Sequence, residues 1–131
     1  MGLTVVITEW GLQSYLALRA SNTFTRDDYK DIIRPDVEKL KTYDPLDAVF
    51  QNSRFWGPAE DYAGKRIADG HKMKWHNIGP RTVQLVLNGE AYLCQAYSKT
   101  SKHLEDREAA KFKTYIQWIR NGNYHRRGVI P

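Results

Sequence analysis

The dipeptide Asn88-Gly89 lies between two runs of alternating apolar residues, and it constrains the fold more than any other feature of the chain. Asn and Gly tolerate the positive φ angles of a type I′ turn, whose twist matches two antiparallel strands. We therefore predict a hairpin with this register: Leu87 opposite Glu90, Leu85 opposite Tyr92, Val83 opposite Cys94, and Arg81 opposite Ala96. One face of the hairpin should belong to the core. Its residues are Val83, Leu85, Tyr92 and Cys94.

A third strand precedes the hairpin and ends near His76. Successive side chains of a strand point to opposite faces, so the basic and apolar residues of this segment separate. Lys72, Lys74 and His76 share one face, and Met73 and Trp75 share the other. A short turn over 77–80, which contains Gly and Pro, joins this strand to the hairpin. The region as a whole predicts a three-stranded antiparallel meander.

Periodicity and end signals predict the elements outside the meander. They are a strand over 3–8, a helix from Trp10 to about Ser21, a helix from Thr25 to about Tyr43 interrupted at Pro35, and a helix from Ser101 to Asn121-Gly122. The tail over 123–131 is expected to be mobile, because termini are ordered only where they dock.

Residues 44–70 contain several Gly and Pro breakers and no clear periodicity. They predict an irregular insertion, with short helical turns near 46–51 and 59–67. A length of 131 residues suits a single domain over 1–131. The predicted fold class is α+β, in the order β-α-α-(irregular insertion)-β-β-β-α, with the antiparallel C-terminal meander packed against the helices.

The charge of the chain is divided unevenly between its halves. Residues 1–64 carry 7 Lys and Arg against 10 Asp and Glu, whereas residues 65–131 carry 13 against 5. The second half is therefore basic, with a net charge of +8 against −3 for the first. Such an asymmetry favours a polyanionic partner, although a basic surface kept for solubility would give the same count.

The cellular setting is predicted from Cys94 and from the N-terminal segment. One cysteine in the whole chain allows no internal disulfide, which fits a reducing compartment. The segment 1–10 has neither a basic leader nor a long apolar run. We therefore expect a cytoplasmic protein that does not bind or cross a membrane.

Several enzyme classes lack their signatures in this sequence. It has no phosphate-binding GxxxxGK[ST] loop, no Gly-rich dinucleotide loop and no GxSxG nucleophile motif. The four histidines are scattered and have no cysteine cluster beside them, unlike a structural zinc site. We expect neither a metal nor another cofactor.

The candidate site is a set of basic residues that the meander would gather at one end. Cations and a histidine there would bind a phosphodiester, stabilise its transition state and transfer protons. The candidate catalytic residues are Lys74, His76, Arg81, Lys99 and His103. The candidate RNA-binding residues are Lys72, Trp75, Tyr97, Lys102 and Arg107, with the two rings stacking bases. The alternative is that Lys72 and Lys74 only discourage edge pairing, and that His76 is an incidental turn residue.

The segments "HKMKW", "GPRTVQLVL" and "AYLCQAYSKTSKH" make the chain resemble the RelE/ParE superfamily of bacterial toxins. The likeness is strongest over 71–103, weaker over 3–43 and absent over 44–70. It implies a metal-independent endoribonuclease that cuts mRNA in the ribosomal A site. In RelE-like members the 2′-hydroxyl is the nucleophile, and cleavage leaves a 2′,3′-cyclic phosphate. A cognate antitoxin protein would neutralise the activity.

The resemblance also implies roles for individual residues. Lys72 and Lys74 match the lysines of the second strand, and Arg81 matches an arginine early in the third. Lys99, Lys102 and His103 are the candidates for basic residues near the end of the last strand. Arg81 and Lys74 would hold the scissile phosphate, and His76 or His103 would transfer protons. The chain lacks the family's C-terminal tyrosine beside a catalytic histidine; the nearest aromatics are Tyr97, and Tyr124 beside His125.

Two other functions fit the same sequence. One is a ParE-like toxin that inhibits DNA gyrase and cuts nothing. The other is a nucleic-acid-binding module without lethal activity, in which Trp56, Trp75 and the aromatic segment 50–62 form the binding surface.

Overall fold

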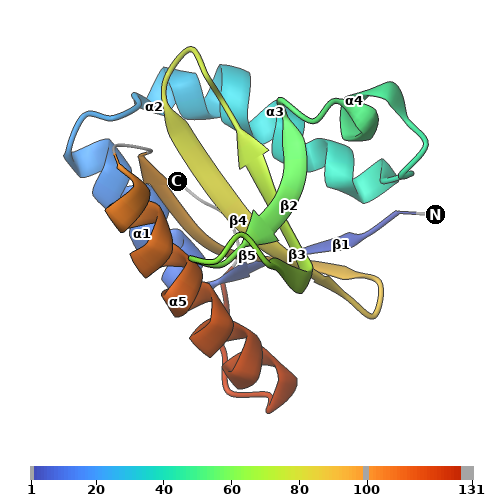
Figure 1. Ribbon diagram of the computed structural model, residues 1–131. Helices are drawn as coiled ribbons and strands as arrows, with labels where there is room; N and C mark the ends of the chain where they lie inside the picture. The colour runs from blue at the N-terminus through green and yellow to red at the C-terminus, as the bar shows by residue number, and fades with distance from the viewer. Residues whose placement is uncertain (1, 99–100, 128–131) are drawn as a thin grey trace.

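The computed structural model describes residues 2–98 and 101–127, and a six-stranded sheet forms its centre (Figure 1). The strands are β1 (Thr4–Thr8), β2 (Trp56–Glu60), β3 (Arg66–Lys74), β4 (Pro80–Leu87), β5 (Glu90–Ser98) and β6 (Arg126–Arg127). Their order is β2-β3-β4-β5-β1-β6, and neighbours are antiparallel except for the parallel pair β1 and β5. The predicted α+β class is therefore confirmed at this level.

Helices cover both faces of the sheet (Figure 1). They are α1 (Glu9–Ala20), α2 (Arg26–Asp28), α3 (Arg34–Glu38), α4 (Ala48–Gln51) and α5 (Lys102–Arg120), with a π-helical turn η1 (Tyr29–Ile33) and a 3-10 turn η2 (Lys39–Thr42). On one face α5 buries Phe112, Ile116 and Ile119 against the sheet. On the other, Ile33 and Leu40 belong to a core cluster that spans α1 to α4. No helix among the described residues is long and apolar enough to cross a membrane.

The helix ends follow their predicted signals. Thr25 caps α2 in a reciprocal pair with Asp28, and the Ser101 side chain accepts from the Leu104 N–H at the start of α5. Asn121 ends α5, and Gly122 has a φ of 74°. The predicted interruption near Pro35 is present as the junction between η1 and α3.

The hairpin of β4 and β5 turns at Asn88-Gly89, with φ angles of 52° and 76°. The predicted pairs of Leu87 with Glu90 and of Leu85 with Tyr92 are confirmed. A bulge follows: Gln84 lies opposite Leu93 but Val83 lies opposite Gln95, so Cys94 is the extra residue. The two predicted pairs beyond this point are wrong by one residue. Arg81 lies opposite Tyr97.

The bulge turns two successive side chains, Cys94 and Gln95, toward α5. Cys94 joins the same core cluster as Phe112, and the Gln95 side-chain amide donates to the Glu108 carbonyl oxygen at 2.8 Å. The predicted core face of the hairpin is confirmed, because Val83, Leu85, Tyr92 and Cys94 all belong to this cluster.

Helix α1 continues along the edge of β5 where β1 ends. The Thr8 hydroxyl donates to the Leu93 carbonyl at 2.7 Å, and the Ser14 hydroxyl accepts from the Ala96 N–H at 2.8 Å. The side chains of Thr8, which caps α1, and of Ser14 within α1 thus satisfy backbone groups that a neighbouring strand would otherwise bind. This protects the edge of β5 against pairing with another chain.

The segment 44–70, predicted as an irregular insertion, contains α4, β2 and the first part of β3. The helical turn near 46–51 is present as α4, but the one near 59–67 is not, because β2 and β3 form an antiparallel pair there. Gly57 and Pro58 read as breakers in the sequence. They are tolerated because β2 is the edge strand of the sheet, where a proline needs no ladder partner on its outer side.

Part of the predicted mobile tail lies against the sheet. Arg126 and Arg127 form β6 beside β1, and the Arg126 guanidinium donates to Glu90 at 2.6 Å. Tyr124 packs edge-on against Tyr92. Residues 128–131 lie outside the described residues.

The thiol of Cys94 is expected to resist alkylation in the folded protein. Burial raises its pKa to about 12, so only roughly one thiol in 10⁴ is ionised at pH 8. Iodoacetamide should therefore label the native chain about 10³-fold more slowly than the chain in denaturant. Mass spectrometry of timed samples measures both rates, and equal rates would contradict the buried position of this strand.

Candidate nucleic-acid interface

Three candidate residues form a row at the end of the meander. The strand register sets Lys74 opposite Arg81, and Arg81 opposite Tyr97. Residues two apart on a strand share a face, so this row lies on the same face as Lys72, whose ammonium contacts Glu105 of α5. The predicted convergence at one end of the sheet is therefore present for these residues.

A turn before β2 holds two of the candidates. The Lys74 ammonium donates to the Ser53 carbonyl oxygen at 2.6 Å, and His76 Nε2 lies 2.7 Å from the Arg54 carbonyl oxygen. The turn itself is organised by Asn52, whose side-chain oxygen accepts from the Arg54 N–H at 3.2 Å. The segment thought to be an insertion thus supplies the acceptors that position Lys74 and His76.

The contact to Arg54 determines which nitrogen of His76 can act as a base. A carbonyl oxygen only accepts hydrogen bonds, so Nε2 carries the proton in this contact. In neutral imidazole the other nitrogen, Nδ1, then has a free lone pair. Because His76 is exposed, this nitrogen can accept a proton from a bound substrate.

Arg81 is a buried cation, with 7% of its surface exposed. Its Nη1 donates to the carbonyl oxygens of Gly79 and Pro80 at 3.3 and 3.1 Å. No carboxylate of the described residues pairs with its guanidinium. A buried charge without a counter-charge is costly, and a phosphate at this end of the sheet would supply one.

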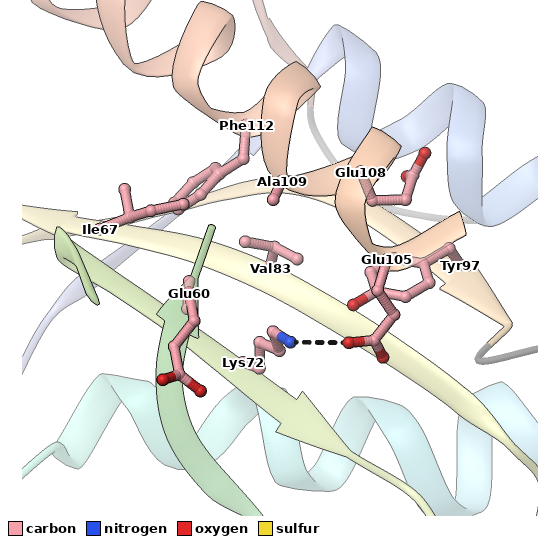
Figure 2. Close-up of a pocket in the computed structure, with 10 residues that line it drawn as sticks. Glu60, Ile67, Lys72, Val83, Tyr97, Glu105, Glu108, Ala109 and Phe112 are labelled. Atoms are coloured by element: carbon pink, nitrogen blue, oxygen red, sulfur yellow. Dashed lines mark hydrogen bonds and ion pairs between the residues drawn. The ribbon is translucent and has the colours of Figure 1, made fainter. Parts of the chain in front are cut away.

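Lys72 and Tyr97 face α5 around a small cavity (Figure 2). The cavity has a volume of about 10 Å³, which suits a single water molecule. The Lys72 ammonium lies 3.2 Å from a Glu105 carboxylate oxygen. Tyr97 is 5% exposed, and its pKa is raised chiefly by burial and then by Glu105 and Glu108. The charge of Lys72 is therefore paired with Glu105, and Tyr97 remains a neutral phenol.

The indole of Trp75 is buried in the core rather than offered to a base. The residue is 6% exposed, its ring packs against Phe55, and its N–H donates to Asp36 at 2.8 Å. The burial of Trp75 and Tyr97 argues against the predicted stacking of bases on these two rings. Both have structural roles instead.

The first turns of α5 carry the other candidates. Lys102 pairs with Asp106 at 2.6 Å and also donates to the Tyr62 carbonyl at 3.3 Å. His103 and Arg107 are exposed, and neither has an ion-pair partner among the described residues. Lys99 lies outside the described residues. Within the described ranges, no group of three or more His, Cys, Asp or Glu is placed to hold a metal ion.

A substitution in β2 tests how strictly Lys74 must be placed. A Cβ added at Gly57 would lie 3.1 Å from the Lys74 ammonium nitrogen, so the flexible end of the lysine must shift by a few tenths of an ångström. We expect Gly57→Ala to change the free energy of unfolding by less than about 1 kcal/mol. The rate of the RNA cleavage proposed below should fall by roughly tenfold, because misplacing a charge weakens transition-state stabilisation.

The adjacent substitution Pro58→Ala is the control for Gly57→Ala, since successive strand residues point to opposite faces. Urea unfolding and a timed cleavage assay measure the two effects. If both variants lost the same activity, the position of Lys74 would not be the cause.

The Asn52 turn could be predicted from the sequence only in part. An Asn between aromatic residues is a signal for a side-chain-capped turn, but it does not say which side chains the turn carbonyls will bind.

Comparisons of the chain with protein-family models, with curated proteins and with solved structures find no match.

Proposed function

We propose that the protein is a toxin of the RelE/ParE type that cleaves mRNA through the ribose 2′-hydroxyl. The observation that supports this best is the Lys74–Arg81 pair beside an exposed histidine whose Nδ1 is free to accept a proton. Two cations can hold and neutralise a phosphate, and the histidine can activate a nucleophile next to it.

We propose the following reaction at these residues. His76 Nδ1 takes the proton of the 2′-hydroxyl, and the 2′-oxygen attacks the neighbouring phosphorus. Lys74 and Arg81 stabilise the negative charge of the five-coordinate transition state. The bond to the 5′-oxygen breaks, and that oxygen takes a proton from a general acid, for which His103 is the candidate. The products are a 2′,3′-cyclic phosphate and a 5′-hydroxyl. No step requires a metal ion.

We also propose the partners that the resemblance implies. These are mRNA in the ribosomal A site and an antitoxin protein that blocks the activity. A substrate on the translating ribosome places the protein in the cytoplasm.

Induced expression in a bacterial host tests the proposal. Wild type is compared with Lys74→Ala and with Lys65→Ala, which removes the same charge from an exposed position outside the site. Growth should stop and new mRNA ends should appear with wild type and Lys65→Ala only. Purified protein should leave 2′,3′-cyclic phosphate ends in the presence of EDTA. Normal growth with intact transcripts in all three strains would refute the toxin function.

Binding without cleavage is a second candidate. The burial of Arg81 favours it, because a guanidinium that is 7% exposed has limited contact with a reacting phosphate, whereas Lys74 can bind RNA without it. Most of the predicted aromatic surface is not available for such binding, since Phe50, Trp56 and Trp75 are all buried. Tyr62 of the same segment is 75% exposed. This candidate predicts that RNA is retained by the purified protein and recovered uncut.

A further inference from the structure

An open cleft of about 480 Å³ lies between α1 and α5. Its floor is the end of β5, at Ala96, Tyr97 and Ser98. The two helices form its walls. This volume is within the range of small-ligand sites, which is about 300–1,000 Å³.

The cleft exists because small side chains line the helix that flanks β5. Ser14 bonds the edge of β5 at Ala96, and Ala17 follows one turn later on the same side of α1. These residues leave space that larger side chains would fill. At one end Trp10 of α1 stacks flat on Tyr115 of α5, with ring centres 4.4 Å apart and planes within 4°. Because both rings line the cleft, the stack closes that end.

The lining combines apolar walls with polar and cationic groups. Leu18 and Leu104 are apolar, Gln13 and Ser98 offer hydrogen-bonding groups, and Arg107 and Lys111 add positive charge. Glu108 also lines the cleft and pairs with Lys111 at 3.0 Å, whereas Arg107 has no carboxylate partner among the described residues. Apolar walls with a few polar groups suit a flat heterocycle, and a guanidinium suits its phosphate.

The cleft adjoins the row of candidate residues. Tyr97 lines the cleft and lies opposite Arg81 in the sheet. A chain of nucleotides with one phosphate at Arg81 and Lys74 would therefore bring a neighbouring base to the cleft. The closed end at Trp10 and Tyr115 favours such a compact group over a helix, which would need a groove open at both ends.

We infer that the cleft between α1 and α5 is a nucleotide subsite, which receives the base next to the scissile phosphodiester and places Arg107 near its phosphate. This inference rests on the proposed function, since it assumes that the polyanion at Arg81 is RNA. The cleft would then make the contact with bases that the buried rings of Trp75 and Tyr97 cannot make.

Two alanine-to-leucine substitutions on α1 test the subsite. Both alanines are exposed, but only Ala17 lines the cleft, so Ala17→Leu narrows the cleft and Ala20→Leu adds the same side chain outside it. Leucine is a good helix former, so both variants should fold, which circular dichroism checks. The probe is a fluorescent six-nucleotide RNA with 2′-O-methyl groups, which cannot be cleaved. The second probe is a series of the same RNA in which each member lacks the base at a different position.

Anisotropy titrations at fixed salt should show about tenfold weaker binding by Ala17→Leu and unchanged binding by Ala20→Leu, the scale expected for one stacked base. For one position of the RNA, removal of the base should weaken binding by the wild type to a similar degree. The same abasic RNA should bind Ala17→Leu no more weakly than the intact RNA does. Equal RNA affinity of Ala17→Leu and wild type would overturn the subsite. A second outcome would also overturn the subsite: Ala17→Leu binds RNA normally but no longer binds an acidic amphipathic helical peptide. The cleft would then be a protein-docking groove.

The same titrations separate this inference from the proposed reaction. If wild type binds the RNA and Ala17→Leu does not, but cleavable RNA stays intact, the subsite stands and the nuclease function falls. If Ala17→Leu binds and cleaves like wild type, the subsite falls and the nuclease function stands. If wild type binds no RNA, both fall.

Discussion

Replacing His76 by alanine should slow RNA cleavage by about 10²- to 10⁴-fold, the usual contribution of a general base. The side chain is exposed, and its one hydrogen bond among the described residues is to the Arg54 carbonyl, so its loss leaves the core untouched. The free energy of unfolding should change by less than about 0.5 kcal/mol, as for other surface positions. Activity and stability should therefore separate in this variant.

His125→Ala is the matched control for this prediction. His125 is also exposed, and it contacts the rest of the chain through its backbone, whose N–H donates to Glu9 at 3.1 Å. It precedes β6, on the far side of β5 from β3 and β4. Cleavage of a labelled RNA, followed on denaturing gels alongside thermal unfolding, should show a loss for His76→Ala alone. Equal cleavage by His76→Ala and wild type would remove His76 as the base and leave His103 as the candidate.

Local signals in the sequence predicted much of the fold. Asn88-Gly89 fixed the turn of the hairpin because few dipeptides adopt two positive φ angles, and Thr25 and Ser101 marked helix starts because their side chains bind the first free N–H groups. The bulge at Cys94 had no such signal. It depends on what faces the strand, here the Glu108 carbonyl that binds Gln95.

The position of the candidate site in the sheet could be predicted from the sequence, but the solvent exposure of its side chains could not. Alternation along the strands was enough to bring Lys74 and Arg81 together. The burial of Trp75 depends on Asp36, which lies 39 residues away in sequence. The orientation of His76 likewise depends on Arg54, at a separation of 22 residues. Contacts between such distant residues leave no periodic pattern in the sequence. The burial of Trp75 and Tyr97, which were predicted to stack on bases, could therefore not be predicted.

The largest expected effect on stability comes from Gly11→Ala in α1. Alanine is the better helix former by about 1 kcal/mol, so helix propensity alone predicts a more stable protein. However, a Cβ at this position would lie 2.3 Å from the Leu93 carbonyl oxygen. That oxygen belongs to β5 and accepts from the Thr8 hydroxyl at 2.7 Å, so it cannot move aside cheaply.

We therefore expect Gly11→Ala to lower the free energy of unfolding by about 1–3 kcal/mol, the usual cost of overpacking. Relief of the clash requires α1 to move away from β5, which breaks the bond between Ser14 and the Ala96 N–H. Gln13→Ala, at an exposed position of the same helix, is the control and should be neutral within about 0.5 kcal/mol. Urea unfolding followed by circular dichroism measures both. A Gly11→Ala protein as stable as wild type would mean that α1 is not held against the edge of β5. The floor and walls of the cleft would then not be fixed relative to each other, and the position proposed for the neighbouring base would lose its basis.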